Sequence, residues 1–337
     1  MTVQVLNGIY ASGVPTVQTM NPNYMNSYKQ ICMKFQQIEF QNYMNQFYHT
    51  CDNSSQLSLS QNNNSSTNSN SMVSDKKYTI AVVDFCDNSD SDIDLDGDGK
   101  GDMAHGNVVA NLIKATFKNS DVYTFDITQN SAGTTNERLV ASLESIINEL
   151  KSGTEKYDAL NMSLSSRITY SALSKALGKT ITKDNVSQYQ SEIRNWLLTQ
   201  GSKNGYTTTA KVVQLIEQIE ALGCDVYIAA ANVNDGTDDE LNLYTIANNT
   251  TSVGALSKSG GKASFSFDNS MIDTWALGEI EVKKVKDSSG KLLGYDLNND
   301  GVVDINGSFT SGGANSANPF LRGTSFASPY KLIQDLK

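Results

Sequence analysis

Apolar runs alternate with amphipathic stretches along the chain after residue 76. Two of these runs, 78–83 and 226–231, are almost wholly apolar, the pattern of strands buried on both faces of a parallel sheet. Period-two and period-3.6 patterns predict further strands at 121–128, 157–164, 252–255 and 263–266, and helices at 104–113, 134–150, 184–199 and 208–222. The alternation predicts an α/β fold, a doubly wound and mainly parallel sheet with helices on both faces.

Local signals mark the ends of two of these helices. Thr134 and Glu137 have the spacing of a capping box, which opens the helix at 134–150. Gly223 follows the helix at 208–222 and is predicted to cap its C-terminus.

The first 75 residues differ in composition from the rest of the chain. Tyr, Phe, Ile and Met recur at spacings of three and four within 21–51, which predicts one amphipathic helix that is either a prosegment or a docking helix. Residues 52–75 are dominated by Asn, Ser and Gln and are predicted to form a flexible linker. We therefore expect an N-terminal helical segment at 1–51, the linker, and one domain at 76–337.

Charge and composition narrow the range of partners. The net charge of −10, from 36 acidic and 26 basic residues, argues against a nucleic acid or an anionic membrane as the main partner. No apolar run has the length of a membrane span, and Met1 to Met20 lacks the pattern of a secretory signal, so the sequence predicts no export route. The oligomeric state is also left open.

The four cysteines contain no Cys-x-x-Cys pair, which argues against a zinc or thioredoxin-type site. Cys32 and Cys51 are the only pair close enough in sequence for a local disulfide.

Two acidic segments resemble the start of a calcium-binding loop, in which alternate carboxylates converge on a cation and a glycine makes the turn. Neither segment carries the bidentate Glu expected at the twelfth position. The alternatives are a solvated acidic turn for the first segment and an Asn-Asp-Gly hairpin turn for the second. The candidate calcium ligands are Asp92, Asp94, Asp96, Asp98, Asp296, Asn298, Asp300 and Asp304.

Three residues that could form a catalytic triad lie at predicted strand or helix ends. Asp84 ends the first buried strand, His105 lies at a helix start, and Ser325 lies at the start of a short helical run. A serine hydroxyl needs an adjacent base to act as a nucleophile, and histidine is a suitable base. A buried carboxylate fixes the tautomer of such a histidine. The only other histidine, His49, borders the linker, so His105 is the candidate base.

With these residues in this order, the domain resembles the subtilisin-like serine proteases. The matching motifs are Ile80-Ala81-Val82-Val83-Asp84, His105-Gly106-x-Val108-Val109-Ala110, Asn161-Met162-Ser163-Leu164, Ala229-Ala230-Ala231-Asn232 and Gly323-Thr324-Ser325-Phe326-Ala327-Ser328-Pro329.

The resemblance implies a serine endopeptidase that cleaves polypeptides through an acyl-enzyme. It gives Ser325 as nucleophile, His105 as base and Asp84 as its orienting acid. Asn232 is implied as the oxyanion donor, although Asn234 has the family's Asn-x-Gly context. Ser163, Leu164 and Ser165 are implied to hold substrate.

The sequence departs from the family pattern beside these residues. Phe85-Cys86 replaces a small hydroxyl residue and a glycine, Asn107 replaces a threonine, and Ser165 replaces a glycine. Two other functions therefore stay open: an inactive, calcium-stabilised binding module of the same fold, and an esterase or amidase that uses the same triad.

Overall fold

A computed structural model describes residues 77–87, 92–95, 101–233, 236–307 and 320–337. The predicted helix within 21–51, the linker at 52–75 and the Cys32–Cys51 pair lie outside these residues. The strands and helices that the structure contains are β1 (Thr79–Asp84), α2 (His105–Thr116), β2 (Asp121–Asp126), α3 (Thr135–Ser152), β3 (Ala159–Met162), β4 (Arg167–Thr169), α4 (Tyr170–Leu177), η3 (Val186–Tyr189), α5 (Gln190–Gln200), η4 (Gly201–Asn204), α6 (Thr207–Ala221), β5 (Asp225–Ala229), β6 (Glu240–Asn242), η5 (Leu243–Ile246), β7 (Thr251–Leu256), β8 (Thr274–Leu277), β9 (Glu279–Glu281), β10 (Lys283–Lys286), β11 (Leu292–Asp296), β12 (Ile305–Asn306), β13 (Phe320–Arg322) and α7 (Thr324–Leu336).

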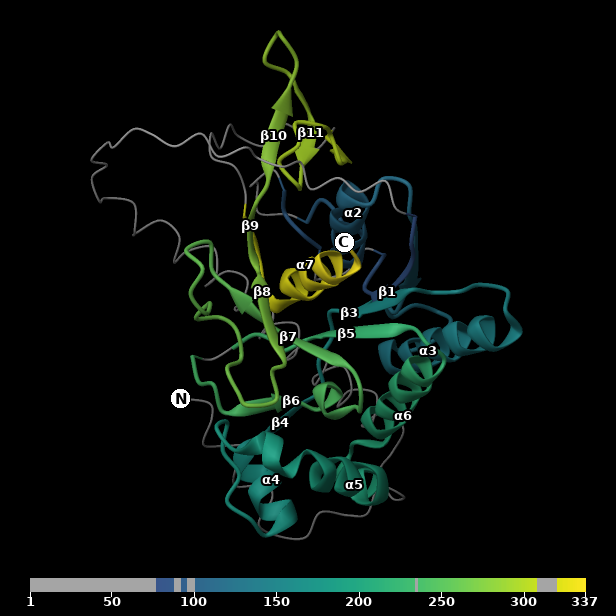
Figure 1. Cartoon of the computed structure of the whole chain (residues 1–337), viewed down its shortest axis with the longest axis vertical. Coiled ribbons are helices and arrows are strands. Elements are labelled where there is room, and N and C mark those ends of the chain that lie inside the picture. The colour runs from purple at the N-terminus through teal and green to yellow at the C-terminus, as the bar shows by residue number, and fades with distance from the viewer. Residues whose placement is uncertain (1–76, 88–91, 96–100, 234–235, 308–319) are drawn as a thin grey trace, which may run out of the picture. The chain divides into compact units, whose positions relative to one another are not determined.

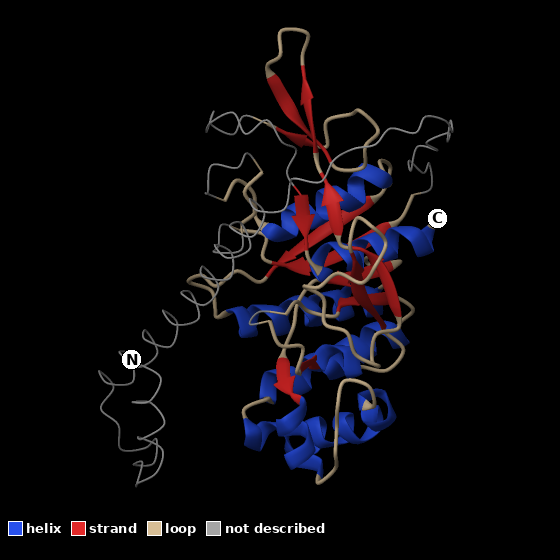
Figure 2. Ribbon diagram, turned by 90° about the vertical axis from the view of Figure 1, so that its left-hand side faces the viewer, coloured by secondary structure: helices blue, strands red, loops and turns tan. Residues whose placement is uncertain are grey.

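A six-stranded parallel sheet forms the centre of the domain, in the order β2-β1-β3-β5-β7-β8. Helices α2 and α7 lie on one side of it and α3 and α6 on the other (Figure 1). The same layers are seen in the perpendicular view, with helices above and below the strands (Figure 2). The predicted doubly wound, parallel α/β fold is therefore confirmed.

Successive residues of the central strand β1 contribute to two separate cores. In β1, Ala81 and Val83 pack in a cluster with the buried stripes of α3 and α6. Ile80 and Val82 pack in a second cluster, with α2 and α7. Because side chains alternate across a strand, a run that is apolar at every position must be covered on both faces.

The direction in which successive strands are added to the sheet changes after β2, although all the strands run parallel. The chain passes from β1 outward to β2 and then returns to the other side of β1, where β3 lies. In open parallel sheets, ligands bind beyond the carboxyl ends of the strands at such a switch point. Asp84 ends β1 and Ser163 follows β3, so these two residues flank that position.

The predicted helix ends agree with the structure, with one small difference. Thr134 accepts from Glu137 N while the Glu137 carboxylate accepts from Thr134 N, which completes the capping box. At the end of α6 the capping residue is Leu222, and Gly223 follows it with a φ of 86°.

Two predictions at the level of single elements are wrong. Residues 263–266 form no strand of the sheet, since only isolated bridges join Leu256 to Lys262 and Asn232 to Ser266. The Ser266 hydroxyl accepts from Ala255 N (3.0 Å), so a side chain takes the place of a ladder partner there. The helix predicted from 184 begins at Gln190, after the short η3 turn.

Candidate active site

Asp84 and His105 form a hydrogen-bonded pair at the carboxyl edge of the sheet. Asp84 is the last residue of β1 and is fully buried, and its Oδ1 and Oδ2 lie 2.9 and 3.0 Å from His105 Nδ1. Phe85 N also donates to Asp84 Oδ1, at 2.7 Å. The carboxylate therefore favours the neutral tautomer with a proton on Nδ1, which leaves Nε2 to accept a proton.

The environment of His105 also alters its affinity for a proton. Burial lowers the pKa of the imidazole, but the negative charge of Asp84 and its hydrogen bond to the ring outweigh this effect, and the net pKa is raised. The pair therefore stabilises the imidazolium, the form that a general base takes after it accepts a proton.

Helix α2 begins in close contact with the end of β1. Gly106 N donates to Phe85 O (2.8 Å), and the Asn107 amide donates to Cys86 O (3.0 Å). A Cβ at position 106 would lie 2.7 Å from Asp84 Cβ and 2.6 Å from Cys86 Sγ. Position 106, next to the histidine, therefore requires glycine. The hydrogen bonds to Phe85 O and Cys86 O hold the Phe85-Cys86 segment, which departs from the family pattern.

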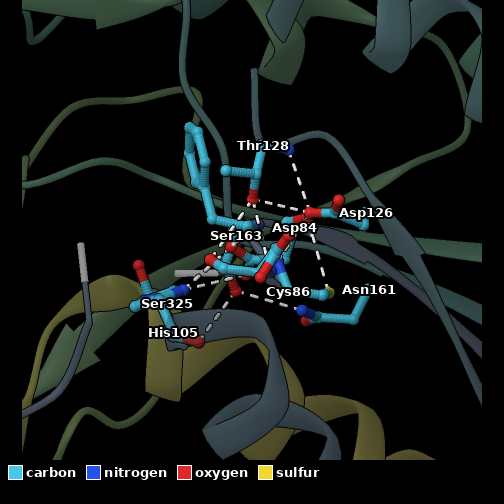
Figure 3. A network of polar contacts seen from close by, with 10 residues as sticks. Asp84, Cys86, His105, Asp126, Thr128, Asn161, Ser163 and Ser325 are labelled. Atoms are coloured by element: carbon cyan, nitrogen blue, oxygen red, sulfur yellow. Dashed lines mark hydrogen bonds and ion pairs between the residues drawn. The ribbon is translucent and has the colours of Figure 1, made fainter. Parts of the chain in front are cut away.

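Asp126, at the end of β2, anchors the same segment through the main chain of Cys86 (Figure 3). Its Oδ1 accepts from Cys86 N (3.0 Å) and from the Thr128 hydroxyl (2.6 Å), while Arg138 pairs with Oδ2 at 2.6 Å. Sequence reasoning missed this residue, because only the pairing of β2 with β1 brings it beside Cys86.

The Cys86 thiol is held in its protonated form. Burial raises its pKa to about 12, with smaller contributions from Asp84 and Asp126. Cys86 and Cys224 are both free thiols.

Ser325 is the second residue of α7, and its main-chain carbonyl is held by the side chain of Ser163, which follows β3. A helical carbonyl normally accepts from the N–H four residues later, but that residue is Pro329, which has none. The Ser163 hydroxyl donates to Ser325 O instead, at 2.8 Å. Because Pro329 has no N–H, Ser325 O stays available as an acceptor, and through it the residue that follows β3 holds the start of α7.

A buried pair extends this connection. The Asn161 amide donates to Ser163 Oγ (3.0 Å), and the Ser328 hydroxyl donates to Asn161 Oδ1 (2.8 Å). Asn161 and Ser328 are both fully buried. Figure 3 draws Asp84, His105, Asn161, Ser163 and Ser325 in one region of polar contacts.

The ring of Phe326, the residue after Ser325, lies 5.6 Å from the His105 ring, centroid to centroid. Among the described residues, no hydrogen bond joins the Ser325 hydroxyl to His105. Catalytic hydrogen bonds are often long in proteins without substrate and shorten when substrate binds.

One hydrogen-bond donor of Asn232 and one of Ser325 lie close to the same position, beside Gly323. Asn232 Oδ1 accepts from Thr324 N (2.9 Å) and Thr324 Oγ1 (3.1 Å), which leaves its Nδ2 free to donate elsewhere. A Cβ built on Gly323 would lie 3.4 Å from Asn232 Nδ2 and 3.6 Å from Ser325 N. Two convergent N–H donors beside a serine have the arrangement of an oxyanion hole.

Backbone strain occurs at the same position. Ala231, immediately before Asn232, has a φ of 87°, a conformation unfavourable for a residue with a Cβ. Strained residues of this kind cluster at functional sites. Asn234, the alternative oxyanion donor, lies outside the described residues.

The candidate calcium ligands are only partly described. Asp96 and Asp98 lie outside the described residues. In the second loop, Asp296 Oδ1 accepts from Asn299 N (2.7 Å), its Oδ2 accepts from Gly301 N (2.8 Å), and Lys118 pairs with Asp300 at 2.7 Å. The described part of the chain contains no group of three His, Cys, Asp or Glu residues arranged to hold a metal ion, so calcium stays a prediction.

The described residues also contain no helix with the length and apolarity needed to cross a membrane.

No family model matches the sequence, and no curated protein matches it. Among solved structures, the chain is similar to a lanthipeptide protease, with 14% identity over 76% of this chain and 72% of that chain and a TM-score of 0.42. It is also similar to a cold-adapted subtilisin-like serine proteinase (16% identity, 83% and 80% coverage, TM-score 0.39). A third structure is MycP1 with its N-terminal propeptide removed (15% identity, 77% and 76% coverage, TM-score 0.40).

One of these structures is a subtilisin-like serine proteinase, and the sequence motifs of this chain resemble the same family.

Proposed function

We propose that this chain is a serine endopeptidase of the subtilisin type. The observation that carries the proposal is the buried Asp84–His105 pair beside a helix that presents Ser325, with the N–H groups of Asn232 and Ser325 converging on one space. These groups support the proposal because acyl transfer by a serine requires a nucleophile, a base with an orienting carboxylate, and donors to the oxyanion.

The proposed reaction has two stages. Ser325 Oγ attacks the carbonyl carbon of the scissile peptide bond while its proton passes to His105 Nε2. Asp84 stabilises the resulting imidazolium, and Asn232 Nδ2 and Ser325 N donate to the oxyanion. His105 then protonates the leaving amine, and a water molecule, deprotonated by His105, hydrolyses the acyl-enzyme.

A polypeptide is the proposed substrate because the segment that follows β3 contacts the helix of the proposed nucleophile, through the hydrogen bond from the Ser163 hydroxyl to Ser325 O. Residues Ser163, Leu164 and Ser165 form this segment, and Ser165 is exposed. Main-chain groups on such an edge can pair with an extended peptide, as in strand addition.

A fluorophosphonate probe, which reacts with activated serines, tests the proposal. We expect the wild-type protein to be labelled and Ser325→Ala not to be labelled. Ser171→Ala is the matched control, because Ser171 is exposed and is also the second residue of a helix, α4. This variant is expected to label like the wild type.

Hydrolysis of casein tests the substrate class in the same variants. Removal of a catalytic serine lowers kcat by about a million-fold in subtilisin, so Ser325→Ala is expected to show no measurable hydrolysis. Labelling that is absent from the wild type or survives Ser325→Ala would overturn the nucleophile assignment. Turnover of small esters without casein hydrolysis would replace the peptidase by an esterase.

A further inference from the structure

Asn242, the last residue of β6, is fully buried and uses every hydrogen bond that its amide can make. Its Oδ1 accepts from the main-chain N–H groups of Ser166 (3.0 Å) and Tyr244 (3.1 Å). Its Nδ2 donates to the carbonyl oxygens of Leu164 (3.0 Å) and Ala229 (2.9 Å). A primary amide offers two donor hydrogens and two acceptor lone pairs, so the side chain is saturated.

The four main-chain groups belong to segments that are far apart in sequence. Leu164 lies in the segment after β3 that is proposed to hold substrate, and Ser166 directly follows that segment. Ala229 is the last residue of β5, three positions before Asn232. One buried side chain therefore fixes the substrate segment relative to the strand that leads to the oxyanion donor.

The hydrogen bonds of Asn242 also define which edge of the segment after β3 is occupied within the protein. In extended chain, the N–H and C=O groups of alternate residues point to the same edge. Contacts at Leu164 O and Ser166 N commit one edge to Asn242, and they direct the main chain of Ser165 to the opposite edge. Ser165 is exposed, and its main chain makes no hydrogen bond with the described residues.

We propose that Asn242 is a positioning residue that holds the 164–166 segment in register for extended peptide substrates; this inference rests on the proposed peptidase function. The hydrogen bonds of the Asn242 side chain reach none of the proposed catalytic residues Asp84, His105 and Ser325. Its loss should weaken recognition of the peptide chain while the nucleophile and its base keep their reactivity.

The test compares two substrates with the same residue at the cleaved bond, a tetrapeptide amide and a single-residue ester. Only the tetrapeptide spans the 164–166 segment. In Asn242→Ala we expect kcat/KM for the tetrapeptide to fall at least about tenfold, mainly through KM, the effect of losing one or two main-chain hydrogen bonds. The values for the ester and the rate of fluorophosphonate labelling should stay within about twofold of wild type.

Thr245→Val is the matched control. Thr245 is buried in the same turn, and its hydroxyl donates to Asn242 O (2.7 Å) without contacting the substrate segment. This variant should lower the melting temperature and leave the ratio of the two kcat/KM values unchanged. An unchanged ratio in Asn242→Ala, or an equal fall for both substrates, would overturn the positioning role.

Amide hydrogen exchange on the wild-type protein decides the question if Asn242→Ala does not fold. We expect Ser166 N–H to be protected in the free protein and Ser165 N–H to gain protection when a tetrapeptide aldehyde is added. No gain at Ser165 with the aldehyde bound would refute the assignment of the free edge. A wild-type protein that is neither labelled nor active on either substrate is a failure of the proposed function, whereas protection of Ser166 still reports on Asn242.

Discussion

Gly323 shows how one missing side chain shapes the candidate site. Its φ of 153° is a conformation that residues with a Cβ rarely adopt, and the space of the absent Cβ is the space on which Asn232 Nδ2 and Ser325 N converge. An added methyl group would occupy the position proposed for the oxyanion.

Gly323→Ala is therefore expected to impair the chemical step more than binding. Loss of one oxyanion donor costs about a hundred- to a thousand-fold in kcat, and obstruction of the space should cost at least as much. Steady-state kinetics on a peptide substrate measure this change. Gly290→Ala, at a turn glycine with a φ of 86° and open space around it, controls for backbone strain and should keep its kcat.

The Asp84–His105 pair predicts the pH dependence of activity. A base must be neutral to accept a proton, and the raised pKa of His105 moves the acid limb of the kcat/KM profile above the ordinary histidine value of about 6.5. Asp84→Asn should move this limb to lower pH and reduce kcat by about 10⁴-fold.

Asp158→Asn is the control for this variant, because Asp158 accepts from Thr79 N (2.8 Å) at the opposite end of β1. Its pH profile of kcat/KM should match that of the wild type. An acid limb that stays at the same pH in Asp84→Asn would remove Asp84 from the proposed triad.

The raised pKa of His105 also affects the stability of the fold. A histidine whose pKa is raised in the folded state adds stability at low pH, and this stability is lost as the pH rises through the folded-state pKa.

At the scale of elements, periodicity predicted the central strands and helices because each has a buried face of fixed period. The apolar run at 78–83 and the stripe in α3 are examples. Within 166–207 the sequence patterns predict neither α4 nor the short strand β4. Strand β4 forms by pairing with β6, which lies more than 70 residues later. Pairing at that range leaves no local period.

Helix α6 contains a carboxyl group that opposes folding at neutral pH. Glu220 lies in the last turn of the helix, where the helix dipole disfavours negative charge. Burial, with a smaller contribution from Asp225, raises its pKa from 4.5 to about 7, although Val226 N donates to its Oε1 (2.6 Å).

This raised pKa makes stability fall as the pH increases. Between pH 4.5 and about 7, the folded protein retains a proton that the unfolded chain has lost, so the free energy of unfolding decreases across that window. Glu220→Gln should therefore raise the melting temperature at pH 8 and leave it unchanged near pH 4. The gain is at most about 3 kcal/mol, reduced by partial exposure to solvent.

Thermal unfolding at the two pH values measures the effect. Glu144→Gln is the control. Glu144, on the neighbouring helix α3, forms an exposed ion pair with Lys211 of α6, so its substitution should change stability little at either pH. Equal shifts of Glu220→Gln at pH 4 and pH 8 would contradict the assignment.

At the scale of the whole molecule, the order Asp84, His105, Ser325 located the candidate site, but not the groups that hold it. Nothing in the local sequence links Asp126 to Cys86 or Asn242 to Leu164, because these contacts are created by strand order. The same holds for Pro329 and Ser163. Pro329 removes the helical donor to Ser325 O, and only the fold shows that the Ser163 hydroxyl donates to this oxygen instead.

The two acidic loops provide the last prediction, because they close in the same way. Leu95 N donates to Asp102 Oδ2 and Leu297 N donates to Asp304 Oδ2, both at 2.7 Å. Among the described contacts of the second loop, Lys118 is the cation that offsets its carboxylates. If calcium binds these loops, it stabilises the folded state in proportion to its occupancy.

We expect the melting temperature to be several degrees higher in millimolar calcium than with a chelator, since about 2.7 kcal/mol is gained at a hundredfold excess over Kd. Asp300→Asn should reduce this shift because it removes a predicted ligand. Asp287→Asn should retain the full shift, since Asp287 lies in the turn between β10 and β11, where its carboxylate binds Ser289. Identical melting temperatures with calcium and with chelator would contradict the prediction of calcium binding. The hydrogen bonds of the loops, and Lys118 in the second loop, would then account for their closure.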